Sequence, residues 1–277
     1  MSCDLCDDTG WKSVELNGAR RVERCDCWRE ALRAKMLAQS GIPPRYRKCD
    51  LDSFRDNNDS LASAVRKARR FAEAFPVVDK GLFFLGKPGL GKTHLSVAIL
   101  REVIKRTNAR AIFCDVRELL KHIRNTYNPV VRSTELQVIH PVMEAELLVL
   151  DDLGAEKTSE WVEETLNLIV NTRYNERRPT ILSSNYAVLD DLNDPDNLIV
   201  RVGYRMWSRF QEMCEFVEIK SVDFRELGPD ATPDELAALD KKGSASHRLQ
   251  APRGRGMAKA HLKPPKELGW SGGKAGS

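Results

Sequence analysis

One octapeptide constrains this 277-residue chain more than any other feature. Residues 86–93 follow the pattern G-x-x-x-x-G-K-[ST], with an apolar segment before them and a helical pattern after them. Glycines let backbone N–H groups wrap a triphosphate, the Lys92 ammonium can reach its β- and γ-phosphates, and the Thr93 hydroxyl can bind Mg²⁺. A chance glycine-rich turn is the alternative. Because both flanks suit a phosphate-binding loop, we expect the chain to bind a nucleoside triphosphate.

An acid at the end of a second buried strand should complete such a site. Four apolar residues, 147–150, lead directly into Asp151 and Asp152. Asp151 is expected to hold Mg²⁺ and Asp152 to orient or deprotonate the attacking water; a turn or a helix cap is the alternative for adjacent acids. Another strand ends at Asn185, which could position that water, although asparagine also favours turns. The residues expected to bind the nucleotide are Gly86, Lys87, Pro88, Gly89, Leu90, Gly91, Lys92, Thr93, His94 and Asp151.

From residue 81 onward, short apolar runs alternate with helical patterns. This alternation predicts an α/β fold, a parallel sheet with helices on both faces. The expected strands are Gly81–Leu85, Arg110–Val116, Leu147–Asp151, Thr180–Ser184 and Phe216–Lys220. The expected helices are Lys92–Arg106, Arg117–Tyr127, Ser159–Arg177 and Asn197–Met213, with two more upstream: Trp28–Ser40, and one from a cap at Asp59 or Ser60 to Phe75.

Four of the seven cysteines form two close pairs at the start of the chain: Cys3 and Cys6, then Cys25 and Cys27. A hairpin that brings two such pairs together provides the four thiolates of a tetrahedral zinc site. The expected hairpin strands are Trp11–Val14 and Arg21–Arg24. Disulfides are the alternative, which a cytoplasmic location disfavours. The other cysteines are interpreted as small core residues: Cys49, Cys114 and Cys214.

Composition and charge exclude several classes of protein. Charged residues make up 30% of the chain and hydrophobic residues 42%, which is typical of soluble globular proteins. No apolar stretch approaches the roughly 18 residues of a membrane span. The acidic start lacks the features of a secretory signal, so we expect a cytoplasmic protein without membrane contact. The formal charge of +4 conceals a basic tail, because residues 241–277 hold nine Lys or Arg against one Glu. We expect this tail to be disordered, with an anionic partner or simple solvation as its two alternatives.

Taken together, these motifs resemble the AAA+ ATPases. The phosphate-binding loop, Asp151-Asp152, Ser183-Ser184-Asn185 and Arg205–Phe210 are similar to the DnaC/DnaI replicative helicase loaders and the related IstB transposition ATPases. Gly41–Tyr46 and the cysteine pairs resemble the DnaI-type loaders in particular. The resemblance covers roughly residues 42–227. The chain therefore divides into a zinc-binding segment at 1–27, a helical region at 28–78, an α/β domain at 79–227 and the basic tail at 228–277. The resemblance implies that 79–227 is an AAA+ domain and that 28–78 interacts with the helicase.

The resemblance also implies roles for three arginines. Arg209, with Arg205 as second candidate, would reach the ATP of a neighbouring subunit, and Arg225 would sense the nucleotide of its own chain. Surface ion pairs with acids such as Glu212 are the alternative for the first two. Many AAA+ proteins carry Glu where this chain has Asp152, and the shorter side chain favours a slow ATPase that acts as a switch.

In the resembled family, the region after the second sheet strand lines a channel for single-stranded DNA. Lys121 and Arg124 would neutralise phosphates there, and a base could stack on Tyr127. A helix with a solvated basic face is the alternative.

The sequence and the resemblance together predict an ATP-dependent loader that places a hexameric helicase on DNA. Such a protein uses ATP, Mg²⁺ and structural Zn²⁺, binds single-stranded DNA and self-associates through its ATP sites. The expected catalytic residues are Lys92, Asp151, Asp152, Asn185, Arg209 and Arg225. An IstB-like transposition ATPase acting on duplex DNA is the first alternative. A P-loop small-molecule kinase is the second.

Overall fold

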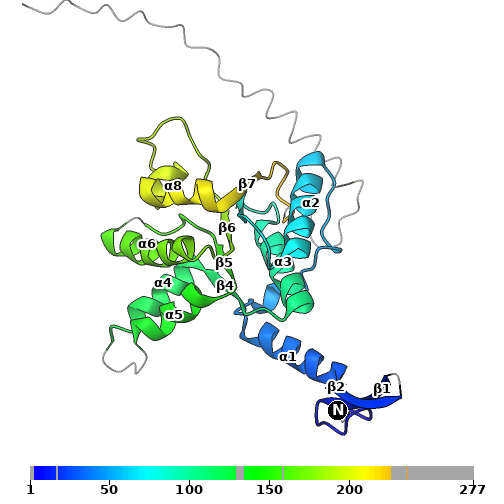
Figure 1. The fold of residues 1–277 in the computed structure, drawn as a ribbon. Helices are drawn as coiled ribbons and strands as arrows, with labels where there is room; N and C mark the ends of the chain where they lie inside the picture. The colour runs from blue at the N-terminus through cyan, green and yellow to red at the C-terminus, as the bar shows by residue number, and fades with distance from the viewer. Residues whose placement is uncertain (1–2, 17, 129–133, 158, 226–234, 236–277) are drawn as a thin grey trace, which may run out of the picture.

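The computed structural model of the chain describes residues 3–16, 18–128, 134–157, 159–225 and 235 (Figure 1). These residues form an antiparallel hairpin, a parallel sheet and the helices around it. The strands are β1 (Trp11–Leu16), β2 (Ala19–Arg24), β3 (Gly81–Leu85), β4 (Ala111–Asp115), β5 (Leu147–Asp151), β6 (Thr180–Ser184) and β7 (Cys214–Glu218). The helices are α1 (Asp26–Gln39), α2 (Asp59–Ala74), α3 (Lys92–Thr107), α4 (Val116–Asn125), α5 (Glu135–Glu144), α6 (Glu160–Asn175), α7 (Leu198–Val202) and α8 (Tyr204–Met213), with a 3₁₀ turn, η1 (Pro44–Tyr46).

The strands of the parallel sheet lie in the order β4-β5-β6-β3-β7. β6 separates β3 from β5 and pairs with both of them. Parallel strands all end at the same edge of a sheet, so the carboxyl ends of β3, β6 and β5 lie side by side. Open α/β sheets bind ligands at this edge, where the chain leaves one strand and crosses to a distant one. The topology therefore brings together the three strand ends that carry or precede predicted site residues.

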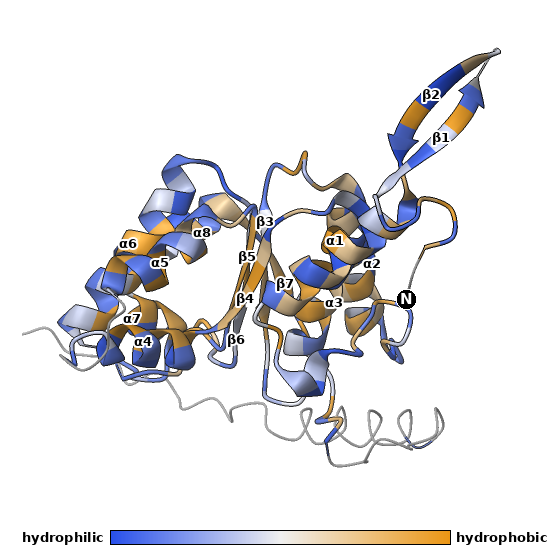
Figure 2. Cartoon of the chain, turned by 90° about the horizontal axis from the view of Figure 1, so that it is seen from below, coloured by the Kyte–Doolittle hydropathy of each residue, from blue (hydrophilic) through white to orange (hydrophobic). Residues whose placement is uncertain are grey.

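Helices cover both faces of the sheet, as the continuous apolar strands require. Phe84 of β3 packs with α2, α3 and the end of α1 on one face. Its neighbour Phe83 belongs to the core cluster of the opposite face. The helices on that face are α4, α5, α6, α7 and α8 (Figures 1 and 2). Burial of each of these rings stabilises the fold by roughly 1.5–3 kcal/mol. The predicted α/β fold with two helical layers is confirmed.

Both edges of the sheet are covered by other parts of the chain. On the β7 side, the Ser60 hydroxyl of α2 donates to the Glu218 carbonyl oxygen (3.2 Å) and accepts from the Lys220 N–H (2.9 Å). On the β4 side, the Phe113 N–H donates to the Ser40 carbonyl oxygen at 2.7 Å. Unpaired edges invite pairing with other chains. These contacts keep the outer strands occupied.

The hairpin β1–β2 and helix α1 extend away from the sheet (Figure 1). The Arg24 guanidinium lies between two indole rings, 3.8 Å from the Trp11 centroid and 4.4 Å from the Trp28 centroid. Met36 and Leu37, near the end of α1, pack against the core on the α2–α3 side. A lone two-stranded hairpin is marginally stable in water, so this arm needs a further constraint at its base.

Several predicted elements match the structure closely. Three predicted strands, Gly81–Leu85, Leu147–Asp151 and Thr180–Ser184, are confirmed to the residue. The last strand starts earlier than predicted, at Cys214. The other three cysteines pack within or against the core, as predicted: Cys49, Cys114 and Cys214.

Two helix predictions were wrong, and one helix was not predicted. The single helix predicted over 197–213 is two helices, because Gly203, with φ of 82°, separates α7 from α8. The N-cap of α2 is Asn58, whose side chain accepts the Leu61 N–H at 2.9 Å, and not Asp59 or Ser60. No helix is predicted over 135–144, yet α5 forms there behind a capping box and contains a proline.

The predicted basic tail, 228–277, lies outside the described residues except for residue 235. Among the helices that the structure describes, none combines the length and the apolar character needed to cross a membrane.

Candidate nucleotide-binding site

The predicted phosphate-binding loop joins β3 to α3 at the carboxyl edge of the sheet. Its turn needs glycine at two positions, because Gly89 and Gly91 have φ values of +80° and +84°. Gly91 is the N-cap of α3, so the helix begins at Lys92. The first N–H groups of a helix lack intrahelical partners and carry partial positive charge. The loop is therefore a preformed anion site.

The Lys92 side chain folds back across this loop. Its Nζ donates to the carbonyl oxygens of Gly86 and Lys87, each at 2.7 Å. The residue is only 6% exposed. Burial lowers the pKa of the Lys92 ammonium to about 8, and the charges of Asp151 and Asp152 oppose this change. A polyphosphate in the loop would favour the charged lysine.

Asp151 lies at the end of β5, next to β6 and within reach of the loop. One carboxylate oxygen, Oδ2, accepts the Thr93 hydroxyl at 2.8 Å, and the other accepts the Ser183 hydroxyl. Burial raises the pKa of the Asp151 carboxyl, while the hydrogen bonds from Ser183 and Thr93 lower it. A hydroxyl and a carboxylate at this distance are the hard oxygen ligands that Mg²⁺ prefers. The structure thus brings together the two residues predicted to hold magnesium.

Asp152 turns its carboxylate towards Asn185. Its φ of 61° is left-handed, a strained conformation that is common at functional sites. The Asn185 amide donates to Oδ1 of Asp152, and the Arg117 guanidinium lies 3.7 Å from Oδ2. The Asp152 N–H donates to the Ser183 hydroxyl at 3.1 Å. Asp152 and Asn185 therefore lie together, as expected, whereas Arg117 and Ser183 had no predicted role.

The loop and the two acids line one groove of about 280 Å³. Arg225 and His94 also line it, as predicted; the His94 Nε2 lies 3.1 Å from the Asp50 carbonyl oxygen. Sequence reasoning gave no role to several other lining residues, although it singled out 41–46 as family-like. These residues are Pro43, Arg45, Tyr46, Phe113, Asp115 and Ser183.

Arg209 and Arg205 lie in a different groove, between α6 and α8. The Arg209 guanidinium donates to the Arg205 carbonyl oxygen at 3.1 Å and lies 5.9 Å from the centre of the Tyr174 ring. Glu212, an alternative partner for these arginines, accepts the Tyr174 hydroxyl at 2.7 Å. Neither arginine lines the phosphate-loop groove of its own chain. The rest of their groove is formed by glutamates, asparagines and one leucine: Glu160, Glu163, Glu164, Asn167, Leu168 and Asn171.

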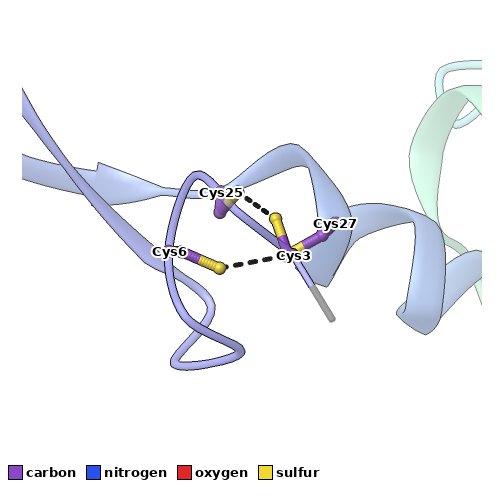
Figure 3. A group of neighbouring side chains, drawn as sticks. All are labelled: Cys3, Cys6, Cys25 and Cys27. Carbon is purple, nitrogen blue, oxygen red and sulfur yellow. Dashed lines mark hydrogen bonds between the residues drawn. The ribbon is translucent and has the colours of Figure 1, made fainter. Parts of the chain in front are cut away.

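The four N-terminal cysteines converge at the base of the hairpin (Figure 3). All four Sγ atoms lie within 4.8 Å of one another, with 3.7 Å between Cys3 and Cys25 and 3.3 Å between Cys6 and Cys27. Zinc with Zn–S bonds of about 2.3 Å in a tetrahedron sets its ligands about 3.8 Å apart. Hydrogen bonds with the neighbouring thiols, Cys6 first, raise the pKa of Cys27. A divalent cation binds thiolates and would replace the protons that these sulfur atoms share, so the donor set fits structural zinc.

The residues predicted to contact DNA lie on and just after α4. Tyr127 is 54% exposed, and its ring meets the Trp161 ring edge-on at 6.3 Å. The Trp161 indole N–H donates to the Tyr127 hydroxyl at 3.0 Å, and the Arg124 guanidinium lies 4.9 Å from the indole centroid. Lys121 pairs with Glu118 at 3.8 Å. Trp161, which had no predicted role, thus joins Arg124 and Tyr127 in one aromatic and basic patch.

Comparison with known proteins identifies relatives of this chain. The model of the IstB-like ATP binding protein family matches residues 19–226. The replicative helicase loader DnaC of Escherichia coli (strain K12) is 30% identical over 147 residues, which are 53% of this chain and 59% of that protein. The match therefore spans less than two thirds of this curated relative.

Solved structures give the same result. The crystal structure of the DnaC helicase loader is 33% identical, with a TM-score of 0.57, and the match covers 64% of this chain and 100% of that one. The crystal structure of DnaI is 27% identical, with a TM-score of 0.54, and the match covers 65% of this chain and 95% of that one.

Proposed function

Because this chain belongs to the family of IstB-like ATP-binding proteins, we propose that it is an ATP-dependent loader of a hexameric replicative helicase. A relative and a solved structure at 30% identity or more are both named helicase loaders. The contact between Thr93 and Asp151 at 2.8 Å, beside Lys92, is the structural observation that carries the proposal. In this account ATP acts as the switch for helicase loading in the cytoplasm during the initiation of DNA replication.

The groove holds the nucleotide through its phosphates. The loop N–H groups and the Lys92 ammonium bind the β- and γ-phosphates, and Lys92 exchanges its bonds to the carbonyl oxygens of Gly86 and Lys87 for bonds to phosphate. Thr93 and Asp151 would hold Mg²⁺, which would supply further positive charge beside the phosphates. The Ser183 hydroxyl keeps the Asp151 carboxylate oriented.

Hydrolysis uses the second acid. Asp152 accepts a proton from the attacking water, and the Asn185 amide, which already donates to Asp152, holds the geometry of the pair. Arg117, at 3.7 Å, stabilises the charged carboxylate. The short aspartate side chain favours slow turnover, which suits a switch better than a motor.

Two arginines complete the site from different sides. Arg225 lines the groove and senses the nucleotide of its own chain. Arg209 lies outside that groove, which leaves it available for the ATP of a neighbouring subunit, with Arg205 as the second candidate. This role would require the chain to self-associate through its ATP sites. A planar guanidinium suits the spread-out charge of a transferring phosphoryl group.

The remaining parts serve the partners. In the proposed loader, the zinc-binding segment, 1–27, and the helical region, 28–78, bind the helicase. The ATPase domain, 79–227, binds the nucleotide and single-stranded DNA. The patch formed by Arg124, Tyr127 and Trp161 supports the DNA assignment, because it combines a cation with the exposed Tyr127 ring beside the partly buried Trp161 ring.

A loading assay tests this proposal. The chain is mixed with the replicative helicase of its source organism and a closed circle of single-stranded DNA with an annealed oligonucleotide, and strand displacement is measured with ATP or ADP. We expect displacement to require the chain and ATP and to be lost in Lys92→Ala. Lys105→Ala, on the exposed end of the same helix, is the matched control and should retain displacement. Failure of the parent chain to stimulate the helicase under any nucleotide condition would refute the proposal.

A transposition ATPase acting on duplex DNA is the second candidate, and the name of the matched family model favours it. Capture experiments separate the two candidates: the chain is tested for binding to a replicative helicase and to a transposase. A loader should bind the helicase, and a transposition ATPase should bind the transposase. A small-molecule kinase should have the same activity per molecule at every protein concentration, with or without DNA. The ATPase activity per molecule of a loader should rise with protein concentration and with added DNA.

A further inference from the structure

The end of the last continuous described segment, residues 221–225, lies across the phosphate-binding loop, and we name it the C-terminal strap. The Phe224 N–H donates to the Gly89 carbonyl oxygen at 3.2 Å, and the Phe224 side chain packs against the core on the α2–α3 side. The Asp223 carboxylate lies so close to Gly89 that a Cβ at residue 89 would come within 1.7 Å of its Oδ1. The absence of a side chain at Gly89 therefore makes room for Asp223 as well as for phosphate.

Within the strap, Asp223 fixes the backbone that carries Arg225. Its Oδ1 accepts the Arg225 N–H at 2.9 Å, an Asx turn of the kind that aspartate and asparagine form two residues on. The Arg225 side chain extends from this turn and lines the nucleotide groove. Both charges act on Lys92: Asp223 raises the pKa of the lysine and Arg225 lowers it. The turn thus sets where the side chain of the exposed residue Arg225 enters the groove.

From these contacts we propose that Asp223 is a positioning residue that holds Arg225 towards the terminal phosphate and so sets the preference for a triphosphate over a diphosphate. A triphosphate carries the extra phosphoryl group that a second cation beside Lys92 can bind with charge-assisted hydrogen bonds. The inference rests on the proposed function, because it requires nucleotide in the groove. It adds to that function a residue that fixes which nucleotide state the groove prefers.

Simple electrostatics offers a competing role for Asp223. A carboxylate beside a phosphate cradle repels anions, so it could instead weaken the binding of every nucleotide. The two roles predict opposite outcomes when the carboxylate is replaced. Asparagine keeps an acceptor oxygen for the Asx turn and removes the charge, whereas alanine removes both.

The test is a titration of fluorescent ATP and ADP analogues with Mg²⁺ on the full chain and its variants. We expect Arg225→Ala to reduce the ratio of ATP to ADP affinity about tenfold, as loss of a charge-assisted hydrogen bond does. Asp223→Ala should reduce it at least about threefold, Asp223→Asn should preserve it, and the double variant should be no worse than Arg225→Ala alone. Asp191→Ala is the matched control, because Asp191 accepts the Asn193 N–H at 2.8 Å in the same kind of turn outside the groove.

Two outcomes overturn the inference. An unchanged ATP-to-ADP ratio in Asp223→Ala removes the positioning role. Tighter binding of both nucleotides in Asp223→Ala and Asp223→Asn replaces it with charge repulsion. Thermal melts check folding, and Asp223→Gly provides the same readout if the alanine variant is unstable. A parent chain that binds neither nucleotide, or a Lys92→Ala variant that binds both as the parent does, refutes the proposed function itself and is distinct from either outcome.

Discussion

Arg173 of α6 offers the clearest test of the fold, because it is the largest fully buried side chain that the structure describes. Its guanidinium donates to the Thr180 hydroxyl and to four carbonyl oxygens, at distances of 2.6–3.1 Å. Those carbonyl groups belong to Val142, Met143, Ala145 and Pro179. Arg173 therefore ties the end of α5 to the start of β6. Burial lowers the pKa of the guanidinium to about 9, so it stays charged at neutral pH.

The expected loss in Arg173→Met can be worked from these contacts. Each buried carbonyl left without a donor costs about 1–3 kcal/mol. Two effects offset part of this sum. The structure around the vacated site relaxes, and the variant no longer buries a charged guanidinium that water would solvate. Removal of one side of a buried charged network typically destabilises by about 3–5 kcal/mol. We expect a loss of that size in the free energy of unfolding, out of a total of about 5–15 kcal/mol for a domain.

Equilibrium unfolding in urea, followed by far-ultraviolet circular dichroism, measures this loss. Arg173→Lys should be intermediate, because an ammonium has three donors in place of five. Arg177→Met, an exposed position just beyond the same helix, is the matched control and should change the free energy by less than about 0.5 kcal/mol. Arg173 lies at the amino edge of the sheet, opposite the groove, so folded Arg173→Met should bind nucleotide with the parent's Kd.

A free energy of unfolding for Arg173→Met within about 1 kcal/mol of the parent would refute this reasoning. So would a large loss in Arg177→Met, since the effect would then not come from the buried hydrogen bonds.

Three further predictions concern the sites. Elemental analysis of the purified chain should find about one zinc ion per chain. The Cys6→Ser variant should lose this zinc and the Cys49→Ser variant should keep it. A zinc-free parent protein with the same melting temperature as the zinc-loaded form would contradict a structural role for zinc. Asp152→Asn should slow ATP hydrolysis about a hundredfold in a phosphate-release assay while the Kd of an ATP analogue changes less than about threefold, and an unchanged rate would remove its proton-accepting role. Arg209→Ala should bind ATP normally but hydrolyse it poorly, and mixing with Lys92→Ala subunits, which still supply Arg209, should restore activity. No recovery in the mixture would argue against action between subunits.

The central site could be predicted because its signals are local. The octapeptide sets the turn at Gly89 and Gly91, and continuous apolar runs mark the buried strands that end at Asp151 and Ser184. The helical segments between them require parallel crossovers, which sets the direction of the strands, whereas their order comes from the structure. The polar residues at the carboxyl ends of these parallel strands then lie along the same edge of the sheet.

The remaining contacts depend on tertiary packing that no short pattern reports. Arg117 reaches Asp152 only because α4 begins beside the end of β5. Phe54 approaches Gly91 so closely that a Cβ there would lie 2.7 Å from its ring. Trp161, near the start of α6, contacts Tyr127, just after α4, although the two residues are 34 positions apart in the sequence. The break at Gly203 also escaped prediction, because the apolar spacing continues through it. Contacts between residues this far apart in the sequence become visible only in the three-dimensional structure.

The measurement that tests the account most directly is the affinity of the chain for a Mg²⁺-bound ATP analogue, with Lys92→Ala and Lys105→Ala beside the parent. The structure predicts that Lys92→Ala loses at least about tenfold in affinity, because a buried ammonium that bonds phosphate is removed, while Lys105→Ala keeps the parent's Kd. Equal Kd values for the parent and Lys92→Ala would contradict the assignment of this loop as the triphosphate site.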